Sequence, residues 1–593
     1  MIVILAQVLM TLHAVAGEMP QTTDAGLLTA DQVTYLVKHA RAELNRVFGI
    51  EAPEPGAPPQ LPDDRVLAVN ITLRVNGKLR ASQSGKGDAI LEKISSAMHN
   101  ALNDRRFGGK SVAGEAADTT VELLLQTRRE AVTGRTSEAV ANEIALGVHG
   151  VAVRQGAKSA YYKPSVAITS GISSAAQLLE KLCRKAGLAK RAWESPAVEI
   201  DRTTWLHYVE RRNAAGPGFV EFHRYRAKHR LPVNRKTVGQ ALDACVRHLL
   251  RLQRADGAYT YIYDPFDDEY ISRGFNRIRI AGTAYAIARF ADFTDDPKLR
   301  ELSRASARRA VKYALGWAVP LPNADNAVFL MEKTGGRGKL GFAALVLLAM
   351  QYAGLHEDFA QQHDALLRGI LLMQGDDGRL AGYALDRNNP GGQDFYPGEA
   401  LLALAMLARR TGQGDLTPVL ERSFPYYRDH FRRKPTTAFV PWQLDAWQTF
   451  NRIQPDPKYT HFADKLADFL ITLQYAPKTS PFQDYVGGFP TTRAPDYTTG
   501  THTESLVVAA RSAKERGLKS RWDRYRDAAR SGLSFLLRLQ ITENELFAFP
   551  SPQLASGGFT KGLTSFKQRC DFQQHAITCL ISALECPGLL KDE

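Results

Sequence analysis

The stretch DFYPGEALLALAMLARRTG, from Asp394 to Gly412, decides how the second half of this chain folds. From Glu399 onward its apolar residues leave almost no polar face, which predicts a helix that is apolar all round. A helix of this kind has to be covered on every side by other elements, so it belongs at the centre of a domain. Its opening nevertheless carries Tyr396 and the carboxylate of Glu399, which a buried helix end does not require.

Five further segments share this character, and the six recur at intervals of 46 to 72 residues. Their starts are read at Thr283, Gly341, Glu399, Asp445, Thr503 and His575. A longer amphipathic helix lies between successive starts, for example over 296–317 and 520–540. Six apolar helices inside a ring of six amphipathic ones would bury every apolar face. The pattern resembles the (α/α)6 toroid of many glycan-active enzymes and, with variants, of terpenoid cyclases and prenyltransferases.

Four of the amphipathic helices end in a similar phrase: HLLRLQRADGAY, GILLMQGDDGRL, DFLITLQYAPK and SFLLRLQITEN. The shared glutamines are Gln253, Gln374, Gln474 and Gln540. In the first two phrases a Gly follows four residues later, where a left-handed helix cap needs it. These phrases resemble the repeat of the cyclase group, but helix capping is the interpretation we favour.

The amino ends of the inner helices are the predicted site, because free N–H groups and positive dipole ends would face one cavity there. Polar and aromatic residues recur at this phase of the repeat. The candidate catalytic residues are Glu399, Asp445, Glu504, Asp571, Tyr396, His502 and His575. The candidate substrate-binding residues are Arg279, Trp442, Trp447 and Gln574. Carboxylates beside aromatic platforms predict a carbohydrate-active enzyme, although Asp and Glu also cap helices.

Several chemistries fit such a funnel, and the sequence leaves them open. Glycoside hydrolysis needs two carboxylates across the scissile bond. Uronate elimination or sugar epimerisation needs a Tyr or His base and a cation such as Arg279 or Arg569. A non-catalytic binding or assembly protein is the main alternative. Isoprenoid processing would use magnesium and the acidic loop 264–269, and a zinc site would need Cys570, Asp571, His575 and Cys579.

The first half of the chain mixes helices and strands. Asn76-Gly77 predicts a hairpin turn, and Gln155-Gly156 a second one. The stretches NGKLRASQSG, NDRRFGG, GVHGVAVRQG, YYKPSVA and LLEKLCRKAGL occur in the order found in the AMMECR1 domain. The sequence resembles that family over most of 26–214, which implies an α+β domain.

The AMMECR1 resemblance implies a fold and little chemistry, because the activity of the family is not settled. The family's Leu-Arg-Gly-Cys stretch reads Leu79-Arg80-Ala81-Ser82 here, so a serine replaces the cysteine. The polar positions to which the resemblance points are Arg80, Ser82, Arg105, His149 and Lys163. Each of them is equally consistent with an ordinary surface or turn residue.

The region between the halves is strongly basic. From Glu210 to Lys236 there are eight Lys or Arg against two acids, which predicts a solvated linker over 216–236. The whole chain carries a net charge of +14, which favours a small-molecule or glycan ligand that is acidic. No signature of nucleic-acid binding accompanies the charge.

The expected organisation is therefore an α+β domain over 18–215, the linker over 216–236 and an all-α (α/α)6 toroid over 237–593. Residues 1–17 are interpreted as a signal peptide that favours export over a cytoplasmic location, because Ala14-Val15-Ala16 follows a short apolar stretch. No apolar run is long enough to span a bilayer. Five cysteines without a zinc pattern suggest neither a disulfide framework nor a metal site, and no cofactor is expected.

Overall fold

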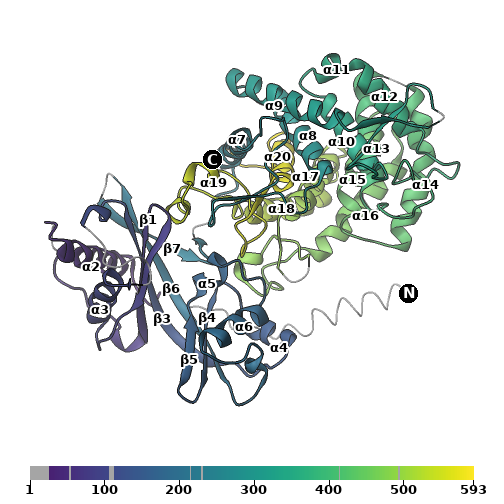
Figure 1. The fold of residues 1–593 in the computed structure, drawn as a ribbon. Coiled ribbons are helices and arrows are strands. Elements are labelled where there is room, and N and C mark those ends of the chain that lie inside the picture. The colour runs from purple at the N-terminus through teal and green to yellow at the C-terminus, as the bar shows by residue number, and fades with distance from the viewer. Residues whose placement is uncertain are drawn as a thin grey trace.

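The computed structural model describes residues 26–51, 55–105, 113–213, 216–228, 231–322, 324–412, 414–491 and 494–592. The proposed signal peptide at 1–17 lies outside these residues. None of the helices in the described ranges has the length and apolar character needed to cross a bilayer. Figure 1 shows an N-terminal domain built around a sheet and a C-terminal domain built from helices.

One eight-stranded sheet organises the N-terminal domain. Its strands are β1 (Ala68–Val75), β2 (Lys78–Ser84), β3 (Thr119–Ala131), β4 (His149–Gln155), β5 (Lys158–Tyr162), β6 (Glu199–Asn213), β7 (Gly216–His223) and β8 (Arg226–Ala227). The order is β2-β1-β3-β6-β4-β5, and β7 pairs with the second half of β6 and carries β8. Every pairing is antiparallel, so hairpins and returns build the sheet without a crossover helix.

Helices cover parts of this sheet. They are α2 (Ala30–Phe48), α3 (Ile90–Leu102), α4 (Ser137–Glu143), α5 (Pro164–Thr169) and α6 (Ala175–Lys185). Helices α2 and α3 pack on β1, β2 and β3, while α6 packs on β4 and β5. Thr29 closes a capping box on α2, and the predicted hairpin turn has positive φ at Asn76 and Gly77. The predicted α+β fold of this half is confirmed.

The expected basic linker over 216–236 needs correction. Strand β7 continues the sheet as far as His223, and a tight turn with positive φ at Arg224 and Tyr225 leads into β8. Both Arg224 and Arg226 are buried rather than solvated. Arg224 donates to Asp484 of the helical domain at 2.7 Å, and Arg226 donates to Thr560 at 2.6 Å and to backbone carbonyls beside it. The positive charge therefore joins the two domains, because buried guanidinium groups need several acceptors.

Twelve of the helices in the described part of the C-terminal domain form an inner and an outer ring. The inner ring contains α8 (Arg277–Phe293), α10 (Leu340–Met350), α13 (Tyr396–Thr411), α15 (Val440–Asn451), α17 (Thr499–Glu515) and α20 (Cys570–Leu584). Each inner helix packs against the next, and α20 closes the ring on α8. The outer ring contains α7 (Arg235–Arg251), α9 (Pro297–Leu315), α12 (Ala360–Leu371), α14 (Thr417–Arg433), α16 (Pro457–Leu473) and α18 (Lys519–Leu537). The predicted all-α toroid is confirmed.

Minor elements complete this domain. The short helices are α11 (Leu355–Asp358) and α19 (Pro552–Ala555), and the short strands are β9 (Ile262–Asp264), β10 (Glu269–Ile271), β11 (Ala318–Pro320), β12 (Val328–Leu330) and β13 (Gln568–Arg569). Most of them lie in the long connections that lead from outer to inner helices. The returns from inner to outer helices are short, so the loop structure gathers at the amino ends of the inner ring.

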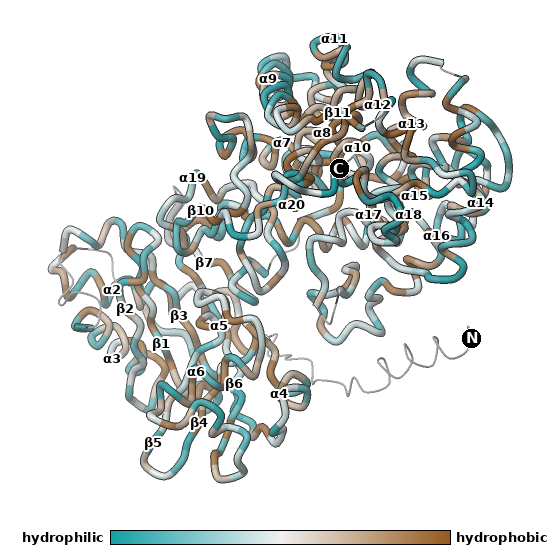
Figure 2. Tube along the Cα trace, turned by 45° about the vertical axis from the view of Figure 1, so that its right-hand side comes forward, coloured by the Kyte–Doolittle hydropathy of each residue, from teal (hydrophilic) through white to brown (hydrophobic). Residues whose placement is uncertain are grey.

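Burial follows the hydropathy of the two rings. All eleven residues of α10 are buried, as expected for a helix that is apolar all round. Figure 2 shows central helices such as α8 and α10 largely in brown and outer helices such as α9 and α14 largely in teal. The inner helices begin one to six residues before the predicted starts, for example at Arg277 rather than Thr283. The apolar pattern locates a helix well but not its first turn, which is more polar.

The four repeated glutamines do more than cap helices. Each side-chain amide donates to a carbonyl of the neighbouring outer helix: Gln253 to Ser306, Gln374 to Val419, Gln474 to Ala528 and Gln540 to Ala241. A glycine with positive φ follows in each loop and lies against a carbonyl three residues further along that neighbour: Gly257, Gly378, Gly487 and Gly557. The repeat therefore links outer helices laterally, and the bond from Gln540 to α7 closes the ring.

Candidate functional site

A cavity runs along the axis of the inner ring. It consists of a wide chamber of about 280 Å³ and an adjoining narrow pocket of about 20 Å³, which share Tyr285, Asp445 and Val508. Because these three residues come from α8, α15 and α17, the two spaces meet in the middle of the barrel. The axial cavity, defined as these two spaces together, is the candidate functional site.

The wide chamber lies at the carboxyl ends of the inner helices. Besides the shared residues, its polar lining comprises Arg289, Asp292, Tyr352, Arg409, Gln448, Thr449, Arg452, Arg511, Ser582 and Glu585. The sequence predicts a hollow at the amino ends, because dipoles and free N–H groups gather there. Instead, the four arginines of this chamber lie near the carboxyl ends of the inner helices, where a positive charge complements the negative end of the helix dipole.

Two of these arginines have free binding capacity. Within the part of the chain that the structure describes, neither Arg409 nor Arg511 forms an ion pair or a hydrogen bond, and the Nε atom of Arg511 is buried without a partner. Arg289, in contrast, binds Glu504 at 3.0 Å and Glu585 at 3.1 Å. An anionic ligand in the chamber would therefore meet unpaired guanidinium groups.

Two predicted carboxylates line the narrow part of the cavity together. Glu504 accepts hydrogen bonds from Arg289 at 3.0 Å, Thr578 at 2.6 Å and Ser582 at 3.1 Å. Asp445 lines both spaces and forms no hydrogen bond or ion pair with any described residue. Burial raises the pKa of each carboxyl, and the charge of Asp445 raises the pKa of Glu504 further. One acid is thus held in place and the other is free to exchange a proton.

The narrow pocket lies on the side of the amino ends. Trp442 and His575 line it together with Glu504 and Thr501. Burial lowers the pKa of His575 to about 4, so the imidazole is neutral near pH 7. Trp442, His575, Asp445 and Glu504 are the predicted site residues that the structure brings together.

Other predicted residues form a separate cluster at the amino end. Asp571 binds Arg279 at 3.0 Å and Arg569 at 2.5 Å, and Arg569 also donates to the Tyr497 hydroxyl at 3.2 Å. Arg279 also donates to the Tyr261 hydroxyl. The two arginines and Asp571 therefore satisfy one another, which accounts for them structurally.

Tyr396 and Glu399, the polar residues at the start of the apolar helix α13, lie where α13 packs against α10. Glu399 is 6% exposed, and its Oε2 atom has no hydrogen-bond partner and lies against Gly341. Burial raises the pKa of this carboxyl to about 8. The ring of Tyr396 meets Tyr383 edge-on at 6.0 Å. Neither residue lines the axial cavity.

Three further predicted residues are packed into the core. Trp447 is fully buried, donates to Gln443 at 2.8 Å and stacks on Tyr459 of an outer helix. His502 is 5% exposed and packs against Phe489, and burial lowers its pKa to about 4. Gln574 is buried against Gly282 of α8. The sequence marked these positions correctly as helix mouths but could not show which way each side chain points.

Sequence reasoning missed the cavity residues near the carboxyl ends, such as Arg289, Arg409 and Arg511. A signal was available, because each is an arginine in the second half of an otherwise apolar inner helix. A charged residue in a helix that has to be buried needs a partner or a cavity. All three line the chamber, and two of them, Arg409 and Arg511, have no hydrogen-bond or ion-pair partner among the residues that the structure describes.

The alternative metal sites receive no support from local geometry. The described residues hold no group of three or more His, Cys, Asp or Glu side chains placed to bind one ion. In the acidic loop, Asp264 pairs with Lys567, and Asp268 accepts from Tyr263 and from Ser551. Cys570 and Cys579 are buried and free, as are the other three cysteines.

The positions implied by the AMMECR1 resemblance do not form one cluster. Arg80 pairs with Glu115 at 3.0 Å, and Arg105 is exposed. His149 is buried and accepts from the Ala145 amide at 3.1 Å, and burial lowers its pKa to about 3. Ser82 lies 3.0 Å from the amine of Lys163.

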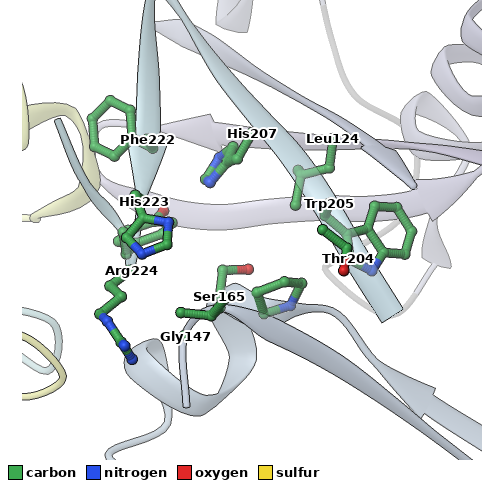
Figure 3. A pocket seen from close by; sticks show the side chains of 12 residues that line it. Leu124, Gly147, Ser165, Thr204, Trp205, His207, Phe222, His223 and Arg224 are labelled. Carbon is green, nitrogen blue, oxygen red and sulfur yellow. The ribbon is translucent and has the colours of Figure 1, made fainter. Parts of the chain in front are cut away.

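A pocket of about 40 Å³ lies beside α5 in the same domain. In Figure 3, Ser165 faces the pocket from α5, and His207 and His223 face it from the strands above. Burial lowers the pKa of His223 to about 4.

Solved structures similar to the helical part include carbohydrate-active enzymes. An inactive variant of an alpha-1,6-mannanase of Salegentibacter sp. matches with 10% identity and a TM-score of 0.41, covering 59% of this chain and 99% of that one. A D-mannose isomerase matches with 10% identity and a TM-score of 0.44, covering 59% of this chain and 97% of that one.

Similarities of sequence concern the N-terminal domain. A protein of Methanopyrus kandleri is 29% identical over 107 residues, which is 18% of this chain and about half, 51%, of that protein. A protein of Thermofilum pendens is 27% identical over 202 residues, which is 31% of this chain and 92% of that protein. The AMMECR1 family model matches residues 37–205, so the first domain is similar to AMMECR1 proteins over that range.

Proposed function

We propose that the toroid domain hydrolyses a glycosidic bond of an anionic sugar in the axial cavity. The observation that carries this proposal is the pair formed by Asp445 and Glu504, which face the same buried space from adjacent inner helices. Glycoside hydrolysis needs two carboxyl groups on opposite sides of the bond, one able to give a proton and one able to accept a proton.

The surroundings of the two acids support different roles. Glu504 is held by one guanidinium and two hydroxyl groups, all of which favour a fixed carboxylate. Burial raises the pKa of both carboxyls, but Asp445 has no hydrogen-bond or ion-pair partner among the described residues that would hold it ionised, so it acts as the general acid. Asp445 protonates the leaving oxygen as the C–O bond breaks. Glu504 accepts a proton from the water whose oxygen bonds to the sugar carbon.

The lining of the cavity supplies an aromatic ring and unpaired cations. Trp442 lines the narrow pocket beside the two acids and offers an aromatic surface there. Arg409 and Arg511 in the wide chamber offer donors for a carboxylate or sulfate group. This arrangement supports an acidic sugar rather than a neutral one.

The test compares wild type with Asp445→Asn and Glu504→Gln on a panel of nitrophenyl glycosides and uronic-acid-containing oligosaccharides. Each variant should lose on the order of 10²–10⁴ in kcat, because each removes a proton-transfer group. Circular dichroism and the melting temperature should stay close to wild type, since both substitutions keep the side-chain shape.

The matched control is Asp571→Asn at the amino end, which should lose stability but keep turnover. Undiminished turnover in both cavity variants would overturn the assignment. Sugar binding without turnover by wild type across the panel would favour a binding protein instead.

A further inference from the structure

A hydroxyl and a buried amine meet on one face of the sheet in the first domain. Lys163 follows β5 and precedes α5, and its side chain reaches across to β1 and β2. The Nζ atom donates to Ser82 at 3.0 Å, to Asn70 at 3.2 Å and to Thr72. Because Thr72 pairs directly with Ser82 in the β1–β2 ladder, both hydroxyls project from the same face.

Among the residues that the structure describes, the direct partners of this amine are uncharged. Glu122 of β3, the acid that acts on the amine electrostatically, is bound by Arg74 at 2.8 Å, Tyr225 at 3.0 Å and His207 at 3.0 Å. Within the described residues, Lys163 therefore lacks the carboxylate partner that normally holds a buried lysine in its charged form. Burial lowers the pKa of its amine to about 8, with Glu122 opposing and Arg74 assisting this shift.

Ser82 is the more exposed residue of the pair, although its hydroxyl also bonds Thr72 at 3.1 Å and Asn70 at 3.3 Å. Ser82 is half-buried on β2, which is at an end of the sheet order, whereas Lys163 is 9% exposed. A substrate therefore reaches the pair from the side of the serine, and the water of the second step reaches Lys163 by the same side. Serine nucleophiles in unrelated proteins are activated by a base at hydrogen-bond distance, including lysine.

We infer that Ser82 and Lys163 form a nucleophile–base pair that cleaves carboxylic esters. In the first step the Ser82 proton passes to the neutral amine of Lys163, Oγ bonds to the acyl carbon, and the leaving alkoxide takes the proton from Lys163. In the second step water loses a proton to Lys163, its oxygen bonds to the acyl carbon, and the proton returns to Ser82 as the acyl–serine bond breaks. The cycle consumes one water and needs no oxidant or cofactor. It is independent of the toroid cavity.

The experiment treats the full-length protein with a fluorophosphonate probe, which replaces its fluoride by a serine oxygen, and locates the adduct by peptide mass spectrometry. The adduct should form on Ser82, and its rate should rise with pH through about 8. Ser82→Ala should abolish it. Ser84→Ala is the matched control, because Ser84 lies on the same strand but bonds the Tyr161 hydroxyl at 3.0 Å, and it should leave labelling unchanged.

Two lysine variants separate a base from a structural donor. Lys163→Arg keeps a charged donor that does not deprotonate, and Lys163→Met removes both functions. Both should slow labelling at least about 100-fold, in the range by which general bases accelerate reactions. Melting temperatures establish which of the two Lys163 variants fold. If neither variant folds, the pH dependence of labelling in the wild-type protein tests the role of Lys163 as a base.

The inference is overturned if Ser82 stays unlabelled on the folded chain at pH 9. It is also overturned if a folded Lys163→Arg variant reacts at the wild-type rate, or if the wild-type rate does not change with pH. Hydrolysis of 4-nitrophenyl acetate by wild type, lost in Ser82→Ala and kept in Ser84→Ala, gives a second readout.

Discussion

The two ends of the inner barrel differ in how their charges are arranged. At the amino end, Asp571, Arg279 and Arg569 bind one another. At the carboxyl end, Arg409 and Arg511 have no partner among the described residues and line a cavity. Charges that satisfy one another stabilise a fold, whereas unpaired charges around a space are available to a ligand. The comparison teaches that a recurring polar residue at a helix mouth is not by itself a site.

The largest expected effect is the change of the unfolding free energy with pH that Glu399 causes. It tests whether water is excluded from this carboxyl at the amino end of the barrel. Its pKa of about 8 in the folded chain lies above the unfolded value, so the full stability is present below pH 4.5. As the pH rises toward 8 the unfolded chain ionises first, which lowers the unfolding free energy by on the order of 4 kcal/mol. Glu399→Gln should remove this loss in denaturant titrations at pH 5 and pH 8. Equal pH dependence in wild type and variant would mean that Glu399 is solvated.

The next effect compares loops at the two ends. Gly378 has φ of +84° in an amino-end loop, and a Cβ there would lie 2.0 Å from the Arg422 carbonyl. Gly412 has φ of +68° at the carboxyl end of α13 and no atom within 4 Å of such a Cβ. Gly378→Ala should cost about 3 kcal/mol from strain and overpacking, and Gly412→Ala about 1 kcal/mol from strain alone. Similar losses in chemical denaturation would show that the amino-end loops are not linked tightly to the outer ring.

The smallest effect separates binding from structure. Arg511→Gln should raise the KM of an anionic sugar about 10-fold to 100-fold with little change in melting temperature, because the guanidinium forms no hydrogen bond or ion pair with the described residues. The same substitution should shift the alkaline limb of the pH–rate profile to higher pH, since Arg511 lowers the pKa of Asp445 in the wild-type protein. Arg279→Gln, the counterpart at the amino end, should leave KM unchanged and cost about 1 kcal/mol of stability. The reverse outcome would move the site to the amino end.

Much of the fold could be predicted because periodicity reports burial directly. The apolar character of α10 and α13 required a surrounding ring, and the hairpin at Asn76-Gly77 required antiparallel strands. The linker failed as a prediction because a charged residue looks the same in sequence whether it is solvated or, like Arg226, bonded inside an interface.

The candidate site could be predicted only in part. Asp445, Glu504, Trp442 and His575 were identified from their positions in the repeat, and the structure places them on one cavity. Trp447 and His502 share the same phase, but their side chains point into the packing between helices. The position of a residue within the repeat predicts how far along the barrel axis it lies. Whether its side chain faces the cavity depends on the rotation of each helix about its own axis, which the repeat does not specify.

The sequence by itself determined the two folds, the six inner helices and the recurrence of the four glutamines, because each depends on local periodicity or on a residue type that recurs in the same phrase; that these glutamines link outer helices was visible only in the structure. Only the tertiary structure decided that a charged chamber lies at the carboxyl ends of the inner helices, that Arg224 and Arg226 join the domains, and that Lys163 reaches Ser82 across the sheet. Those features depend on distances between segments far apart in the chain, which packing determines and composition does not record.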